Sequence, residues 1–213
     1  MSQHDHWESV HQSKPSDRTS WYQPHLERSL EFLRATGLTT GAAIIDVGGG
    51  TSTFVDDLLA AGHSDLTVLD LSETALFRTR ARLGDRAEGV TWITGDVTRT
   101  ELPEHRYDFW HDRAVFHFLV DERARERYVA AVRHSLRPGG HIVVATFGPG
   151  GPEQCSGLEV VRYEPDSLHA EFGAAFRKIA STTEHHVTPW GTEQEFVYCY
   201  CRMSAQRSGA GMG

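Results

Sequence analysis

The amino-acid sequence predicts an α/β fold: a doubly wound, seven-stranded mixed sheet with its last strand antiparallel and with helices on both faces. Two observations predict it. Between residues 42 and 147, short continuous apolar runs alternate with helical patterns, as in folds that bury parallel strands between helices. After residue 176, two strand-like segments are separated only by "TPWGT", which predicts an antiparallel hairpin that completes the sheet.

The predicted elements follow one another in a regular order. Apolar runs place parallel strands at 42–47, 66–71, 90–96, 107–112 and 141–147. Helical spacing of apolar residues, with start signals such as Pro24 and Ser72 and stop signals such as Gly37 and Gly62, places helices at 24–36, 51–62, 72–84, 121–136 and 164–176. The last two strands are expected at 177–187 and 193–203.

The chain length and composition predict one domain with short extensions. At 213 residues the chain is long enough for one sizeable core. We expect a single domain over residues 21–203, a polar, His-rich and flexible N-terminal arm or lid over 1–20, and a disordered tail of small residues over 204–213.

Charge, hydropathy and cysteine content exclude several classes of function. The net charge of −8 offers no basic excess for nucleic acid, and no apolar stretch approaches the about 20 residues that span a bilayer. Three cysteines without a pairing pattern suit a reducing, cytoplasmic location. We expect no metal site, because the candidate ligands His185 and His186 are adjacent and point to opposite faces of a strand.

The segment "DVGGGTS" after the first strand predicts a ligand site. Glycines at this position let a ligand approach the backbone, at the edge of the sheet where such folds bind cofactors. No lysine follows Gly50, which argues against a P-loop, and Thr53 stands where a dinucleotide motif has its third glycine. Asp46, two residues before Gly48, would repel a pyrophosphate and suits a cationic ligand.

These residues resemble the first motif of the class I S-adenosylmethionine-dependent methyltransferases, whose fold is Rossmann-like. The motif acid–x–Gly–x–Gly–x–Gly is met here by Asp46 to Ser52, with serine in place of the last glycine. "VLDLS", "ITGDVT" and "LRPGGHIVVATF" resemble later motifs of the family, so that the resemblance covers roughly residues 40–150. The resemblance implies that S-adenosyl-L-methionine is the cofactor and S-adenosyl-L-homocysteine its product. The cofactor-binding residues that it implies are Asp46, Gly48, Gly49, Gly50, Asp70, Leu71, Asp96 and Val97.

Within this set, two acids have distinct implied roles. The resemblance assigns Asp70 to both ribose hydroxyls and Asp96 to the adenine amino group. The alternative for each is a carboxylate that only caps a helix or a turn. The segment "SWYQP" precedes the first core helix, which in the family lies near the methionine end of the cofactor. We therefore expect Trp21 to form part of a lid there and Arg18 to meet the cofactor carboxylate, with aromatic packing of the arm as the alternative for Trp21.

The acceptor side is expected after the fourth strand, in "YDFWHDRAVFHFL". Asp112 is the first catalytic candidate, as a base or an orienting group, followed by His111 and His117. The alternatives are an N-cap or turn residue for Asp112 and a core or surface histidine on the following helix for His117. Asp112 stands where methyltransferases acting on lysines of elongation factors and citrate synthase carry Asp/Glu-Lys-Gly-Thr, but the next residues here are Arg113 and Ala114. The segments "WYQP" and "WHDRAVFHFL" also resemble a group of small bacterial methyltransferases.

The sequence thus predicts a methyltransferase that acts on a small-molecule acceptor, with no nucleic-acid or membrane partner. A protein lysine N-methyltransferase is the alternative among enzymes. A non-catalytic S-adenosylmethionine-binding protein is the alternative from another class, and an NAD-dependent oxidoreductase is a further one. The Gly- and Pro-rich loop at 147–158, which contains Cys155, is expected over the acceptor pocket.

Overall fold

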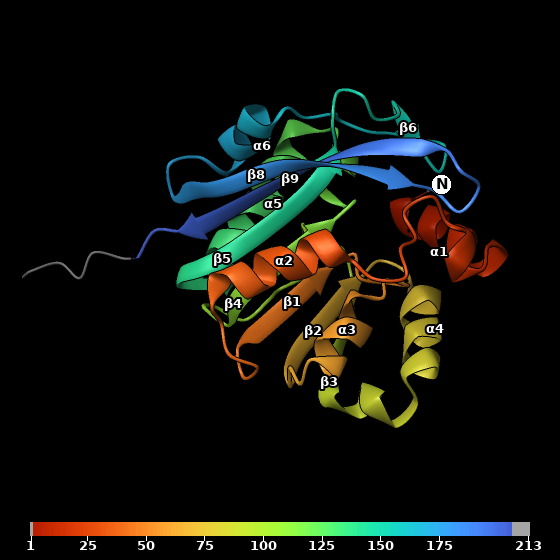
Figure 1. Cartoon of the computed structure of the whole chain (residues 1–213), viewed down its shortest axis with the longest axis horizontal. Helices are drawn as coiled ribbons and strands as arrows, with labels where there is room; N and C mark the ends of the chain where they lie inside the picture. The colour runs from red at the N-terminus through yellow and green to blue at the C-terminus, as the bar shows by residue number, and fades with distance from the viewer. Residues whose placement is uncertain (1, 206–213) are drawn as a thin grey trace, which may run out of the picture.

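The computed structural model describes residues 2–205 of the chain. Most of the tail predicted at 204–213 therefore lies outside the described residues. Figure 1 shows a central sheet with helices on both sides and the N-terminal helix at one end of the strands.

The sheet has seven strands in the order β3-β2-β1-β4-β5-β9-β8. Strands β1 to β5 pair in parallel, and β9 runs antiparallel to both of its neighbours, β5 and β8. The strands are β1 (Ala43–Val47), β2 (Asp65–Asp70), β3 (Val90–Thr94), β4 (Tyr107–Arg113), β5 (Leu136–Phe147), β8 (Phe176–Val187) and β9 (Glu193–Met203). The predicted mixed sheet with an antiparallel last strand is confirmed, and the last strand is inserted between β5 and β8.

The order also creates the point at which a ligand site is expected. Strand β1 pairs with β2 on one side and with β4 on the other, so the chain leaves β1 in one direction and later returns on its other side. Helices that follow β1 and β4 lie on opposite faces, which opens a crevice at the carboxyl ends of these strands.

Helices cover both faces of the sheet, and alternate residues of each strand pack into two separate cores. They are α1 (Gln3–Ser13), α2 (Glu27–Thr36), α3 (Phe54–Ala60), α4 (Glu73–Leu83), α5 (Glu122–Ser135) and α6 (Pro165–Phe172), with short 3-10 turns at η1 (Ser16–Arg18), η2 (Gly84–Gly89) and η3 (Phe116–Phe118). In β1, Ile44 packs with α2, α3 and α4, whereas Ile45 packs with α5 and α6. None of the helices in the described part of the chain is long and apolar enough to cross a membrane.

Helix α1 was not predicted from the sequence. It lies inside the segment expected as an arm, and a capping box between Ser2 and Asp5 begins it. Its only buried residue is His11, so it lacks the apolar stripe by which a helix is recognised in a sequence. Figure 1 shows it beside α4, at the carboxyl ends of the first strands.

Smaller differences concern element ends and the loop after β5. Helix α2 begins at Glu27, after Leu26, and not at Pro24. Helix α6 ends before Gly173, whose φ of 67° is left-handed, so the expected extension to residue 176 does not form. The Gly- and Pro-rich loop carries a two-stranded hairpin, β6 (Gln154–Cys155) and β7 (Leu158–Glu159).

Candidate active site

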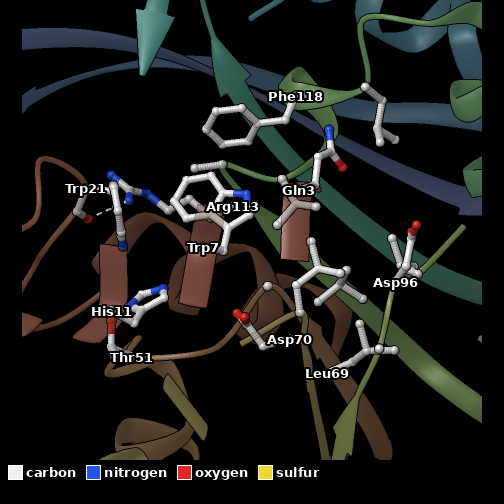
Figure 2. A pocket seen from close by; sticks show the side chains of 18 residues that line it. Gln3, Trp7, His11, Trp21, Thr51, Leu69, Asp70, Asp96, Arg113 and Phe118 are labelled. Atoms are coloured by element: carbon white, nitrogen blue, oxygen red, sulfur yellow. Dashed lines mark hydrogen bonds between the residues drawn. The ribbon is translucent and has the colours of Figure 1, made fainter. Parts of the chain in front are cut away.

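Two adjoining pockets lie at the carboxyl ends of β1 to β4. The larger one, here called the large pocket, is shown in Figure 2 and is lined by the ends of β1, β2, β3 and β4, by η3 and by helix α1. The second, here called the small pocket, lies between the glycine turn and residues 16–26. The two pockets share Trp21, Gly48, Thr51 and Arg113.

The glycine turn holds the backbone close to two carboxylates. Gly48 has a φ of 69°, a left-handed conformation that side chains rarely adopt. A Cβ atom on Gly49 would overlap the carboxylate of Asp46 and lie 2.8 Å from Val68, and one on Gly50 would overlap the carboxylate of Asp70. All three glycines are therefore required by the turn itself, including Gly49, which stands at a position where the motif allows any residue.

Ser52 takes a local role at the position where the motif has its last glycine. Its hydroxyl accepts a hydrogen bond from the amide of Phe54 at 3.1 Å, at the start of α3. It lines the small pocket with Thr51 and Thr53. The serine therefore satisfies the first amide of α3, whose N-cap residue is Thr53.

Asp70 lies at the end of β2 and lines the large pocket. Its Oδ2 accepts the amide of Gly50 at 2.9 Å, and its Oδ1 accepts the amide of Ser72 at 2.8 Å. Burial raises the pKa of Asp70 to about 6, although both amide hydrogen bonds act in the opposite direction. Each oxygen keeps acceptor capacity, so the carboxylate can take two further hydrogen bonds from a ligand.

Asp96 follows β3 and lines the same pocket, together with Leu71 and Val97. Its Oδ1 accepts from the amide and the hydroxyl of Thr98, at 2.9 and 2.7 Å, and its Oδ2 lies 3.6 Å from Arg99. The side chain is 33% exposed, so Oδ2 remains available to a donor in the pocket. The structure thus brings the predicted cofactor residues of three strands to one pocket.

Asp46 and Arg113 give the small pocket two buried charged groups with free atoms. Asp46 is 3% exposed, and its Oδ2 has no hydrogen-bond partner among the described residues. Arg113 donates to Tyr198 Oη at 3.0 Å and to the carbonyl of Trp21 at 2.9 Å, and its guanidinium lies 4.3 Å from the ring centre of Phe196. Its Nη2, 3.6 Å from Glu184, has no hydrogen-bond partner in the described chain.

His111 lies in the wall of the small pocket and is fully engaged. Its Nδ1 donates to Asp46 Oδ1 at 2.7 Å, and in the neutral ring Nε2 accepts the hydroxyl proton of Ser29 at 2.8 Å. Both ring nitrogens are used and the side chain is 1% exposed, so the ring has no atom free to contact a methyl acceptor. It orients the Asp46 carboxylate so that Oδ2 stays free.

Asp112 lies in neither pocket. It is completely buried on the α5 side of the sheet, where Tyr128 donates to its Oδ2 at 2.6 Å and the amide of Val115 donates to its Oδ1 at 3.0 Å. Trp110 in turn donates to the Tyr128 hydroxyl at 3.0 Å. Burial raises the pKa of Asp112 to about 6. Alternation along β4 turns residues 110 and 112 away from the face of 111 and 113, so the structure does not bring Asp112 to an acceptor.

His117 is also buried and lines neither pocket, whereas its neighbour Phe118 lines the large pocket. The amide of Phe147 donates to its Nδ1 at 3.1 Å. Burial, with a smaller contribution from Arg113, lowers the pKa of His117 to about 3. The core histidine given as the alternative is what the structure shows.

The buried imidazole of His117 predicts a loss of stability in acid. Its pKa is about 3 in the folded state and about 6.5 in the unfolded chain, so the unfolded state binds more protons as the pH falls. We expect its contribution to fall by about 2 kcal/mol between pH 6.5 and pH 5. Urea unfolding at both pH values should show a smaller decrease in His117→Gln than in the wild type. An equal decrease would contradict the assignment.

The two candidates near the N-terminus, Trp21 and Arg18, differ in whether they line a pocket. Trp21 lines both pockets, whereas Arg18 is exposed at the end of η1 and lines neither. The cation present at the pockets is Arg113, which the sequence places in the acceptor-side cluster without a role. Three residues of α1 that line the large pocket, Gln3, Trp7 and His11, were missed; their spacing of four was the available signal.

The remaining candidates form no metal centre. His186 contacts Gln23 at 3.1 Å and the carbonyl of Ser20 at 2.7 Å, and the neighbouring His185 pairs with Glu193. Cys155 is buried, 3.8 Å from the hydroxyl of Ser20. Among residues 2–205, no group of three or more His, Cys, Asp or Glu side chains is arranged to hold a metal ion.

The sheet order and a glycine turn beside acids at the ends of β2 and β3 are the arrangement of a Rossmann-like fold that binds its ligand at the carboxyl ends of the strands. A family model described as a methyltransferase domain matches residues 44–140. Together with the fold, this match identifies a class I S-adenosylmethionine-dependent methyltransferase domain, whose cofactor is S-adenosylmethionine.

Known relatives agree with this assignment. The chain is 34% identical over 110 residues to the ubiquinone/menaquinone biosynthesis C-methyltransferase UbiE of Roseobacter denitrificans, over 50% of this chain and 43% of that protein. It is 24% identical over 133 residues to EEF1A lysine methyltransferase 2 of Danio rerio, over 59% of this chain and 57% of that protein. The chain spans only part of these curated relatives, down to 20% of a mouse eEF1A lysine and N-terminal methyltransferase.

A solved structure shares the fold over nearly the whole chain. It comes from work on the conversion of a disulfide bond into a thioacetal group during echinomycin biosynthesis. The TM-score is 0.77 at 18% identity, over 97% of this chain and 95% of that chain. At this identity the similarity concerns the fold alone.

Proposed function

We propose that the protein transfers a methyl group from S-adenosylmethionine to a nucleophilic atom of a small-molecule acceptor. The observation that carries the proposal is the pair of adjoining pockets. One is lined by Asp70 and Asp96, and the other holds free atoms of opposite charge on Asp46 and Arg113. An adenosine and a zwitterionic amino acid joined through one sulfur match these two pockets.

For the adenosine, the proposal uses the ends of β2 and β3. The two oxygens of Asp70 take the ribose hydroxyls, and Asp96 takes the adenine amino group. Leu71 and Val97 supply apolar contacts to the adenine ring, because both line the pocket beside these acids. Gly48 to Gly50 keep the turn close to the strand ends, since a Cβ atom at these positions would overlap Val115, Asp46 and Asp70, respectively.

For the methionine end, the proposal uses the two free charged atoms. Oδ2 of Asp46 takes the ammonium, and Nη2 of Arg113 takes the carboxylate. Both atoms are buried without a hydrogen-bond partner, although Nη2 lies 3.6 Å from Glu184, and such burial is costly unless a ligand supplies the missing hydrogen bonds. The sulfur then lies where the pockets meet, beside Trp21 and Gly48.

Removal of the Arg113 cation should selectively weaken recognition of the cofactor carboxylate. We expect the wild type to bind S-adenosylmethionine about 10- to 100-fold more tightly than its decarboxylated analogue, because a charge-assisted hydrogen bond contributes about 1.5–3 kcal/mol. In Arg113→Gln this preference should fall below about threefold. Calorimetric titration with both ligands measures it.

The matched control is Arg18→Gln, which removes a cation that lines neither pocket. It should keep the wild-type preference. If Arg18→Gln loses the preference and Arg113→Gln keeps it, the assignment of the carboxylate reverts to Arg18.

When bound, the cofactor supplies an electrophilic methyl group on a sulfonium. The chain's own contribution is to hold this group, align the acceptor with it and exclude water. The N-terminal segment fits the last task, because Trp7, His11 and Trp21 line the pocket together with the strand ends. We propose that residues 1–20 act as a lid.

The covered pocket favours a small acceptor over a protein. A lysine on a folded protein would reach the pocket only after α1 moved, and Asp112, the acid shared with the lysine methyltransferases, is buried elsewhere. Protein lysine methylation remains the second candidate, because relatives named for it match more than half of the chain.

Two measurements test the proposal. Calorimetry with S-adenosylhomocysteine should show binding, and its absence at millimolar concentration would overturn the cofactor assignment. Methyl-labelled cofactor is then incubated with the protein and either a proteome extract or its small-molecule fraction. We expect label in small molecules; label only in protein would support the lysine candidate. Binding without any transfer would support a non-catalytic cofactor-binding protein.

A further inference from the structure

One face of helix α1 forms a wall of the large pocket. Gln3, Trp7 and His11, spaced by four residues, all line it, and Figure 2 shows them on the side of the pocket opposite Asp70 and Asp96. Because residues four apart share one side of a helix, α1 presents a continuous surface to whatever binds there. The strand ends supply the contacts proposed for the cofactor, so this surface is free to contact the acceptor.

Contacts from the middle and the C-terminal end of α1 hold it in place against α4. The carboxylate of Glu8 accepts hydrogen bonds from the Ser72 hydroxyl at 2.5 Å and from the amide of Thr74 at 3.1 Å, at the start of α4. Arg78 donates to the carbonyl of Lys14 at 2.6 Å. The face of α1 that lines the pocket is therefore positioned by the same helix whose first turn adjoins Asp70.

The wall is mostly aromatic. The ring centre of Trp7 lies 5.0 Å from the ring centre of Phe118 and 5.7 Å from that of Trp21, and both pairs are edge-to-face. Val115 and Leu119 continue the surface along the segment after β4. Such a surface favours a flat apolar molecule, which gains both buried area and ring contacts.

His11 is the polar group of this wall with an unused atom. The residue is 5% exposed, and its Nδ1 has no hydrogen-bond partner in the described chain. The charged groups around it are Glu8 on its own helix and Arg78 on α4. Burial, and then Arg78, lower its pKa to about 4, so the ring is neutral near pH 7 and can accept a hydrogen bond.

The charges at the pocket disfavour a cationic acceptor. The acids that line it in the described chain are Asp70 and Asp96, and the proposed function assigns both to the adenosine. Arg113, which also lines the pocket, is assigned to the cofactor carboxylate. An ammonium group on the acceptor would therefore have no unassigned acid in the pocket lining to pair with.

We propose that the acceptor is a flat, uncharged aromatic molecule with a ring hydroxyl or ring N–H, which packs against Trp7 and Phe118 and donates its heteroatom proton to Nδ1 of His11. This inference rests on the proposed function, since it places an acceptor beside a bound cofactor. It makes His11, and not Asp112, the catalytic residue on the acceptor side.

The step is balanced without a further reactant. A lone pair on the ring oxygen or nitrogen forms the new bond to the methyl carbon, and the carbon–sulfur bond breaks with its electron pair remaining on sulfur. The proton of the acceptor passes to Nδ1 of His11 and from there to water when the products leave. The sulfonium becomes a neutral thioether, and the acceptor leaves methylated and uncharged.

The test uses the full chain, methyl-labelled cofactor and a defined set of probes. These are single-ring phenols and N–H heteroaromatics, the same compounds already methylated on the heteroatom, and primary aliphatic amines including lysine. We expect label in phenols or N–H heteroaromatics, competitive inhibition without label by the methylated analogues, and no label in the amines. Label in amines faster than in any aromatic probe overturns the proposal.

Variants of α1 then test the assigned residues with the best aromatic probe. His11→Gln should lower kcat by about 100-fold or more and change KM and the affinity for S-adenosylhomocysteine by less than about threefold. A purely structural role would change all of them together. The matched control His4→Gln, on the exposed side of the same helix, should behave as the wild type.

Trp7→Ala should raise KM for the aromatic probe by about 10-fold, whereas Phe77→Ala, which removes an aromatic ring 69% exposed on α4, should not. Wild-type kcat in His11→Gln overturns the role of His11. Binding of S-adenosylhomocysteine with transfer to none of the aromatic probes overturns the acceptor class and leaves the proposed cofactor intact. Failure to bind S-adenosylhomocysteine instead contradicts the proposed function itself.

Discussion

Replacing Asp70 with alanine is expected to weaken S-adenosylhomocysteine binding by about 3 kcal/mol, or about 150-fold in Kd, because two hydrogen bonds from the ribose to a carboxylate are lost. The affected atoms are the two oxygens that also accept the amides of Gly50 and Ser72. Calorimetric titration of the folded variant measures the change.

The controls separate this contact from damage to the turn. Asp70→Asn keeps an oxygen acceptor for one amide and should bind with intermediate affinity. Asp65→Ala, at the other end of the same strand, removes an acid far from the pocket and should bind as the wild type does. Unchanged affinity in a folded Asp70→Ala would show that this acid does not contact the cofactor.

The second large effect concerns stability. Asp112→Ala should lower the free energy of unfolding by about 3 kcal/mol, because it leaves the buried hydroxyl of Tyr128 and the amide of Val115 without an acceptor. The affinity for S-adenosylhomocysteine should stay within about threefold of the wild type, since Asp112 lies in neither pocket. Denaturant unfolding and calorimetry give the two values.

The Tyr128→Phe variant provides the partner measurement. Its loss of stability and that of Asp112→Ala should not add in the double variant, because both break one hydrogen-bond chain through Trp110. If Asp112→Ala instead kept its stability and lost methyl transfer, the catalytic role predicted from the sequence would be restored.

The sheet and the cofactor side of the site were predictable because their signals are local. The apolar runs of β1 to β5 and the acids at the ends of β2 and β3 can each be found within a few residues of sequence. The acceptor side depends instead on the face to which a residue points. His111 and Arg113 share one face of β4, and Asp112 lies on the other, where α5 covers it. Adjacent residues of β4 therefore belong to the pocket and to the core in turn, because they point to opposite faces of the sheet.

Helix α1 was unpredictable for a related reason. A helix that lines a pocket and reaches the core through Trp7 needs no regular apolar stripe, and its sequence is typical of a solvated segment. Its contribution becomes visible only when Trp7 and His11 are placed beside Arg113 and Phe118.

The contacts of Glu8 and Arg78 with α1 also bear on how quickly the pocket exchanges its contents. If a ligand enters and leaves only when these hydrogen bonds open, the energy of opening slows association and dissociation alike. The two effects then cancel in the equilibrium constant. Weakening the Glu8 contacts with Ser72 and Thr74 would therefore shorten the residence time of a bound molecule while its affinity stayed nearly the same. In such an arrangement, the opening of α1 sets an upper limit on the rate of turnover.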